Sequence, residues 1–92
     1  MEEMMEEYVT INALTMSSSI ETIYSNSKGA IVKTILLHPT NSDVKKATLL
    51  FDGVAFDFEL LNGTTIINTP ILVKSIKGSG QGVNIHITGL QL

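Results

Sequence analysis

The side chains that could do chemistry in this chain are few, and the first of them are two carboxylates. Asp57 and Glu59 stand two positions apart, so in a β-strand they share one face at about 6 to 7 Å. Paired carboxylates at such a separation can perform glycoside hydrolysis, one as the acid and the other as the nucleophile or base. Nothing nearby in the sequence supplies an aromatic platform for a sugar, so we expect both side chains to lie on a solvated face.

The two histidines are the next candidates, as metal ligands or as a pH-responsive contact. His38 precedes Pro39 at the end of an apolar run, and His86 lies within the alternating segment VNIHIT. Neither has a carboxylate or a cysteine at the local spacing of a metal site, and the chain has no Cys at all. We therefore expect no metal site, unless the fold or a symmetry axis brings the two imidazoles together. A pH-responsive contact stays open as the alternative.

A glycine-rich loop, Lys77–Gly82 (KGSGQG), has the spacing of a phosphate cradle. Such loops bind phosphate where they lead into the N-terminus of a helix, whereas strand-like residues follow this one. We expect a hairpin loop with no cofactor. Because the sequence also offers no nucleophile beside a base, it predicts a protein that is not an enzyme.

The elements that would position these residues are predicted to be strands. From about residue 8 to residue 92 the sequence consists of short β-type runs separated by turn residues, with no amphipathic helix. Ser25–Gly29 is rich in turn formers and is expected to separate two strands, and Pro70 marks a sheet edge or corner. The expected strands are residues 8–14, 19–25, 30–38, the two arms of 47–60, 64–68, 71–76 and 83–88.

The clearest local signal is the segment ATLLFDGVAFDFEL, residues 47–60. Asp52-Gly53 between two β-type runs predicts a two-residue hairpin with a type I′ turn. In the second arm Val54, Phe56, Phe58 and Leu60 fall on one face, and we expect the two phenylalanines to be internal.

For two further segments the sequence predicts which side chains are buried. The near-continuous apolar run of residues 30–38 is expected to form a central strand buried on both sides. In the last strand Val83, Ile85 and Ile87 point inward, and His86 alternates with them on the outward face.

Strands at spacings of about 8 to 12 residues, joined by tight turns, are typical of an antiparallel sandwich. We therefore predict an all-β chain: a single antiparallel β-sandwich of about seven or eight strands, immunoglobulin-like or jelly-roll in type. Residues 8–92 form this domain. Residues 1–7, with Glu2, Glu3, Glu6 and Glu7, form a short acidic N-terminal arm, either a frayed end that aids solubility or an arm that orders on a partner subunit.

Composition and charge favour subunit contacts. A chain of 92 residues buries only about 60 to 65% of its unfolded surface, and with no Cys it has no disulfide staple. Its hydrophobic fraction of 43% and charged fraction of 16% indicate surface hidden against neighbours, so a homo-oligomer is expected. The body is nearly neutral and the sequence has no Arg, which argues against nucleic acid as a partner. No apolar run is long enough for a membrane span, and the acidic start is unlike a secretory signal.

The stretch from Ile23 to Leu92 resembles small all-β virion proteins of tailed bacteriophages. The resemblance is carried by an opening TIYSNSKGAIVKTILLHPTNS, a middle ATLLFDGVAFDF, a TPILV segment and a close GQGVNIHITGLQL. Members of that group serve as head-decoration, head-fibre or tail-accessory subunits. The likeness covers about three quarters of the chain, excludes the acidic start, and carries over no functional residue.

The resemblance implies a non-enzymatic structural protein of a phage virion, assembled in the host cytoplasm. It would bind capsid or tail proteins and sister subunits through its strand edges and apolar outward residues. The alternative is a carbohydrate- or receptor-binding sandwich module, which would need exposed aromatic side chains for stacking.

Overall fold

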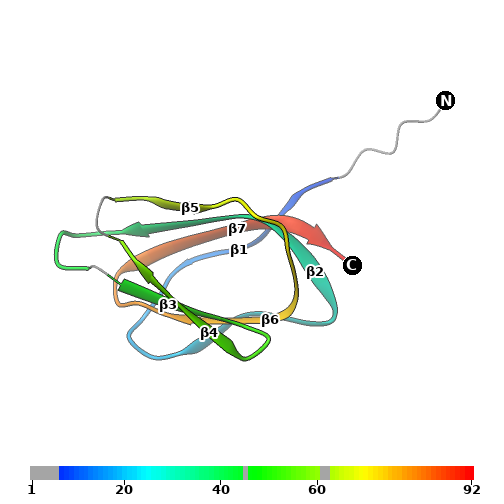
Figure 1. Ribbon diagram of the computed structural model, residues 1–92, viewed down its shortest axis with the longest axis horizontal. Helices are drawn as coiled ribbons and strands as arrows, with labels where there is room; N and C mark the ends of the chain where they lie inside the picture. The colour runs from blue at the N-terminus through cyan, green and yellow to red at the C-terminus, as the bar shows by residue number, and fades with distance from the viewer. Residues whose placement is uncertain (1–6, 45, 61–62) are drawn as a thin grey trace.

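The computed structural model describes residues 7–44, 46–60 and 63–92. Within these ranges the chain forms seven strands and no helix (Figure 1). The strands are β1 (Val9–Thr15), β2 (Glu21–Pro39), β3 (Lys46–Phe51), β4 (Val54–Glu59), β5 (Thr65–Ile67), β6 (Ile71–Ser79) and β7 (Val83–Gln91). The prediction of an all-β chain is confirmed.

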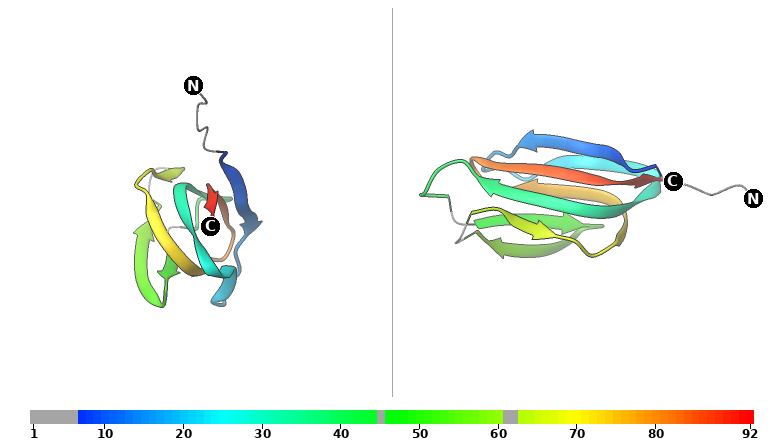
Figure 2. Two further views of the ribbon diagram at one scale, coloured as in Figure 1. Left: turned by 90° about the vertical axis from the view of Figure 1, so that its right-hand side faces the viewer. Right: turned by 90° about the horizontal axis from the view of Figure 1, so that it is seen from above.

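All seven strands belong to one open, antiparallel sheet, in the order β1-β7-β2-β6-β3-β4, with β5 also paired to β2. The prediction of antiparallel strands is confirmed, but the structure does not separate them into the two sheets of a sandwich. The sheet is strongly curled, so that β3 and β4 lie across the molecule from β1 and β7 (Figure 2). One hydrophobic core lies inside this curl, and the strands at both ends of the sheet order contribute side chains that are buried in it or packed against it.

Strand β2 explains why the sheet stays continuous. The sequence predicts two strands separated by a turn at Ser25–Gly29, and this prediction is wrong: β2 runs unbroken from Glu21 to Pro39. Ser25 pairs with Ser75 and Ala30 pairs with Val73, so residues 26–29 face the single residue Lys74. The turn-forming residues therefore make a bulge, because both flanks pair with the same neighbour, β6. Beyond the bulge β2 pairs with β7 and β5.

The core is formed by one face of each long strand. The inward prediction for β7 is confirmed, since Val83 and Ile87 are fully buried and Ile85 is almost so. The run at residues 30–38 is central in the sheet, as predicted, but only its inner face is covered. Ile35 and Leu37 are fully buried there, whereas Leu36 between them is exposed.

The β3–β4 hairpin forms as predicted. Phe51 pairs with Val54, which leaves Asp52 and Gly53 as a two-residue loop with positive φ values of 51° and 85°. These values are the backbone conformation of a type I′ turn. The Asp52 carboxylate accepts hydrogen bonds from the backbone N–H groups of Lys74 (2.8 Å) and Ser75 (2.9 Å), so the tip of the hairpin is tied to β6.

Candidate functional site

Strand β4 is an edge of the sheet in the described part of the chain. Two of the side chains on its core-facing side are exposed to solvent. Leu49 and Phe56 are cross-strand partners, so both point to the same side. Leu49 is fully buried, whereas Phe56 is 48% exposed and Val54 is 58% exposed. The prediction that Phe56 is internal is therefore wrong, and Phe58 is only partly buried. The physical reason is that, in the part of the chain that the structure covers, the sheet ends at β4, so Phe56 has a neighbouring strand on one side only.

These side chains form one wall of an apolar groove, and residues near the β5–β6 corner form the other. The rings of Phe51 and Phe56 contact each other with centroids 5.6 Å apart and planes tilted by 54°. Leu72, at the other wall, is 70% exposed. The apolar residues that we call the β4 groove are Phe51, Val54, Phe56, Phe58, Ile67, Ile71 and Leu72.

One edge of β4 pairs with no other described strand, so it adds unpaired backbone groups to this apolar surface. Two other strands are edges in the described part of the chain, but they are less suited to pairing. Strand β5 is short, with Pro70 close behind it, and β1 has a register irregularity between Thr10 and Asn12. Strand β4 pairs with β3 in regular register over its whole length. It is therefore the edge best prepared to accept another strand.

The two carboxylates lie on the opposite face of β4, as the sequence predicts. Asp57 and Glu59 are both exposed, and Asp57 accepts a hydrogen bond of 2.8 Å from the hydroxyl of Thr48 on β3. Asp57, Glu59, Thr48 and Lys46 line a hollow on this outer face of the β3–β4 hairpin.

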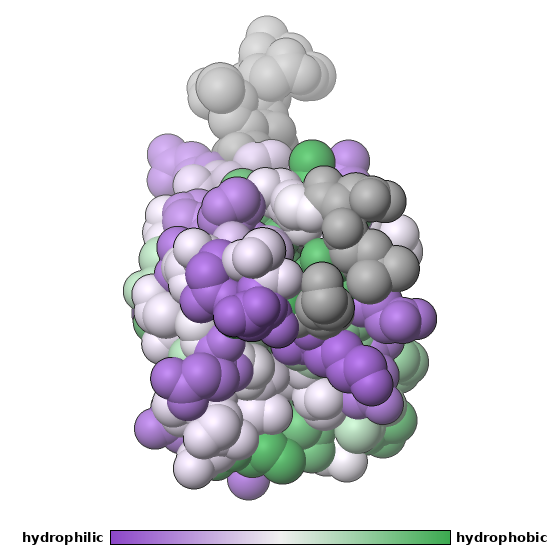
Figure 3. Space-filling view, turned by 90° about the vertical axis from the view of Figure 1, so that its left-hand side faces the viewer, coloured by the Kyte–Doolittle hydropathy of each residue, from purple (hydrophilic) through white to green (hydrophobic). Residues whose placement is uncertain are grey.

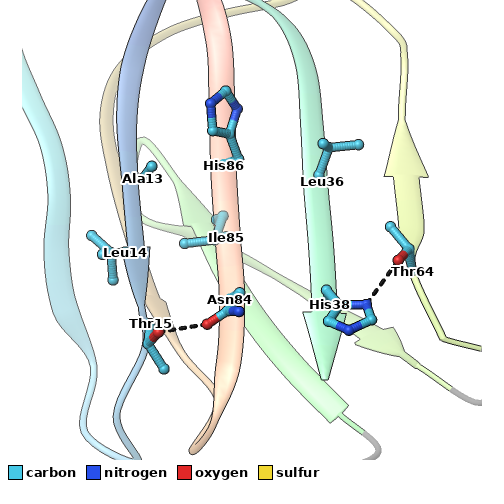
Figure 4. Close-up of a pocket in the computed structure, with 9 residues that line it drawn as sticks. All are labelled: Ala13, Leu14, Thr15, Leu36, His38, Thr64, Asn84, Ile85 and His86. Atoms are coloured by element: carbon cyan, nitrogen blue, oxygen red, sulfur yellow. Dashed lines mark hydrogen bonds between the residues drawn. The ribbon is translucent and has the colours of Figure 1, made fainter. Parts of the chain in front are cut away.

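The fold brings the two histidines onto one outer face, in a shallow hollow across β1, β7 and β2 (Figure 4). His38 pairs with Asn84 and His86 pairs with Leu36, so the imidazoles are diagonal neighbours on adjacent strands. His38 Nδ1 lies 2.8 Å from the hydroxyl of Thr64, and Thr15 donates a hydrogen bond to Asn84. No Asp or Glu lines this hollow. Across the described residues, no group of three or more His, Asp or Glu side chains could hold a metal ion.

The backbone of the glycine-rich loop forms hydrogen bonds with the segment between β1 and β2. The backbone N–H groups of Gly80 and Gly82 donate to the carbonyls of Ser17 and Met16, so neither points at a free phosphate site. The loop is also not the predicted hairpin, because β6 and β7 each pair with β2. The loop instead joins β6, whose Gly78 pairs with Glu21 at the start of β2, to β7, whose Val83 pairs with Pro39 at the end of β2. Its role is structural.

The end of the molecule seen in Figure 3 is mostly hydrophilic, with hydrophobic residues gathered toward the lower part of that view.

The predicted N-terminal arm, residues 1–7, lies outside the described residues except for Glu7, which is exposed. In the part of the chain that the structure covers, no helix has the length and apolar character needed to cross a membrane.

Comparisons of the chain with protein-family models, curated proteins and solved structures give no match. Functional inference therefore comes from the residues and surfaces of this chain. Sequence reasoning missed Val54, Phe56 and Leu72 as exposed groove residues. The β-type runs that contain these residues predicted strands correctly, but a local pattern does not say which strand ends the sheet.

Proposed function

We propose that this chain is a non-enzymatic structural protein of a phage virion. In this proposal it is a decoration or accessory subunit that binds the capsid or tail surface and sister subunits. The observation that carries the proposal is the β4 groove beside a regular, unpaired strand edge. An apolar groove joined to an open edge is typical of a surface that binds protein.

The composition supports the same function. A nearly neutral body favours neither nucleic acid nor an anionic membrane. The apolar residues of the β4 groove account for part of the high hydrophobic fraction without being fully buried in a single copy. A subunit bound at many repeated sites needs only weak contacts with each neighbour, because multivalency adds to the total binding.

We further propose that the curled sheet is a β-sandwich of immunoglobulin-like or jelly-roll type, in which β2 passes from one layer to the other. Supporting this, Leu49 on β3 and Ile87 on β7 belong to one buried cluster, although β2 and β6 separate their strands in the sheet. This arrangement would place the β4 groove at an open side between the two layers.

The test of the virion function is the content of purified particles. Particles of the phage that encodes this chain, purified by density gradient, are expected to contain it at a fixed copy number relative to the major capsid protein. Quantitative mass spectrometry measures this ratio. Absence of the chain from particles, with normal expression in infected cells, would overturn the proposal.

The alternative function is a carbohydrate- or receptor-binding module, and the histidine hollow favours it. Imidazole, amide and hydroxyl groups from His38, His86, Asn84 and Thr15 face one shallow depression (Figure 4). Such groups are suited to hydrogen-bonding a sugar. A glycan array would decide: this alternative predicts a ligand whose binding is lost in Asn84→Ala and kept in Phe56→Ala.

A further inference from the structure

We propose that β4 pairs in antiparallel fashion with β4 of a second copy, with Phe56 at the two-fold axis. This inference rests on the proposed assembly function and names its surface and its partner. The partner is a second copy of this chain, held by backbone hydrogen bonds along β4 and by apolar contacts over the β4 groove.

The hairpin determines which backbone groups of β4 are free. In a two-residue hairpin, the pair that closes the loop, here Phe51 and Val54, is hydrogen-bonded. Hydrogen-bonded and non-bonded pairs alternate along antiparallel strands, so Ala55, Asp57 and Glu59 direct their N–H and C=O groups away from β3. These groups are therefore available to a strand added at the edge.

Only registers that oppose these free groups to one another can form. Centring the pair on Phe56 places Ala55 opposite Asp57 of the second copy and Val54 opposite Phe58. Centring it on Asp57, Phe58 or Glu59 would bring two carboxylates directly opposite each other, which is unfavourable. Centring it on Ala55 would use the turn residue Gly53, whose φ of 85° is not that of a strand. The Phe56 register avoids both problems.

The same register buries apolar surface that a single copy leaves open. The added strand continues the sheet, so its own Val54, Phe56 and Phe58 point to the side of the β4 groove. On the opposite, solvated face of the continued sheet, both copies present the carboxylates of Asp57 and Glu59. The two-fold axis makes each copy both donor and acceptor of the contact, and this closes the assembly as a dimer.

The available area predicts a weak dimer. A phenylalanine side chain buries about 150 to 250 Å², so Phe56, 48% exposed, offers about 100 Å². Val54, 58% exposed, adds a comparable amount and the partly buried Phe58 adds less, so the two copies together reach several hundred Å², below the roughly 1,600 Å² of a standard interface. We expect dissociation in the micromolar range or weaker.

Disulfide cross-linking tests the register, because the chain has no Cys of its own. A mixture of single variants Ala55→Cys and Asp57→Cys should give a heterodimer on mild oxidation, since hydrogen-bonded partners have Cα atoms about 5.5 Å apart. Ala55→Cys alone, and a mixture of Ala55→Cys with Glu59→Cys, should stay monomeric. Cross-linking in either of these controls, or none in the first mixture, would overturn the proposal.

Proline substitution tests the pairing without cysteines. Ala55→Pro removes an N–H that β3 does not use, so the fold should survive while self-association weakens at least tenfold. The matched control is Ala13→Pro on the other long edge strand, β1, where the N–H of Ala13 donates to the side-chain oxygen Oδ1 of Asn12. Sedimentation equilibrium measures association, and circular dichroism checks that both variants fold. Equal association in the two variants would contradict the proposal.

Failure of this inference is separable from failure of the proposed function. If the wild-type chain is found in particles but is monomeric in solution and not cross-linked, β4 pairing is wrong and the virion function stands. If the chain dimerises through β4 but is absent from particles, the virion function is wrong and the pairing stands.

Discussion

At the residue scale, single polar and glycine residues fix how strands approach one another. Asp52 ties the β3–β4 hairpin to β6 with three hydrogen bonds: its carboxylate accepts two, and its own N–H donates to the carbonyl of Ser75 at 2.9 Å. Gly89 allows β2 and β7 to come close, since a Cβ there would overlap the carbonyl oxygen of Ile31 and lie 3.0 Å from Cα of Val32. Neither role depends on chemistry at a ligand site.

Removal of the Asp52 carboxylate should loosen the hairpin. We expect Asp52→Ala to lower the free energy of unfolding by about 1 to 3 kcal/mol, because two backbone N–H groups lose a charged acceptor. Asp52→Asn is the control, since its amide oxygen can still accept and Asn tolerates the positive φ. Urea denaturation measures both, and an equal loss in the two variants would contradict this account.

A methyl group at Gly89 should cost more than one at Gly53. Gly89→Ala forces backbone atoms of β2 and β7 apart, and we expect a loss of about 2 to 4 kcal/mol. Gly53→Ala meets nothing within 4 Å, so it should cost only the about 1 to 2 kcal/mol of a positive φ. Comparing their midpoints in guanidinium tests this, and a smaller effect at Gly89 would show that the close approach is unimportant.

At the scale of elements, β3 and β4 have the same alternating pattern but different surroundings. Strand β3 lies between β6 and β4, whereas among the described residues β4 pairs with β3 alone. Their cross-strand partners Leu49 and Phe56 therefore differ in burial although both point to the core side. Leu49 therefore stabilises the fold, whereas the exposed ring of Phe56 is accessible to a partner.

Truncating these two partners should have different effects on the monomer. Leu49→Ala removes a fully buried side chain and should cost about 2 to 5 kcal/mol. Phe56→Ala removes a half-exposed ring and should cost about 1 kcal/mol, while weakening self-association more than Leu49→Ala does under conditions where both are folded. Denaturation at low protein concentration isolates the monomer. A loss at Phe56 as large as that at Leu49 would mean that Phe56 is a core residue.

At the scale of the whole molecule, one curled sheet encloses one core and leaves a side of it open at the β4 groove. A small chain without disulfides has little stability to spare. Contact with a second copy along β4 would cover apolar surface that the single copy exposes. Assembly and stability are therefore expected to be coupled in this protein.

This coupling predicts a melting temperature that depends on concentration. Because a partner that binds only the folded state stabilises it by mass action, the wild-type chain should melt a few degrees higher at about 500 μM than at about 5 μM. Ala55→Pro should show no such rise. Differential scanning calorimetry measures both, and a concentration-independent wild-type melting temperature would contradict the coupling.

The sequence by itself determined the all-β class, the Asp52-Gly53 hairpin and the inward face of β7, because turn conformation and side-chain alternation are local properties. Only the tertiary structure decided that Ser25–Gly29 is a bulge, that the Lys77–Gly82 loop joins two strands that each pair with β2, that Phe56 is exposed and that His38 and His86 share a face. These outcomes depend on which strands become neighbours. That choice is made by burial of the whole core, and no local pattern of residues contains it.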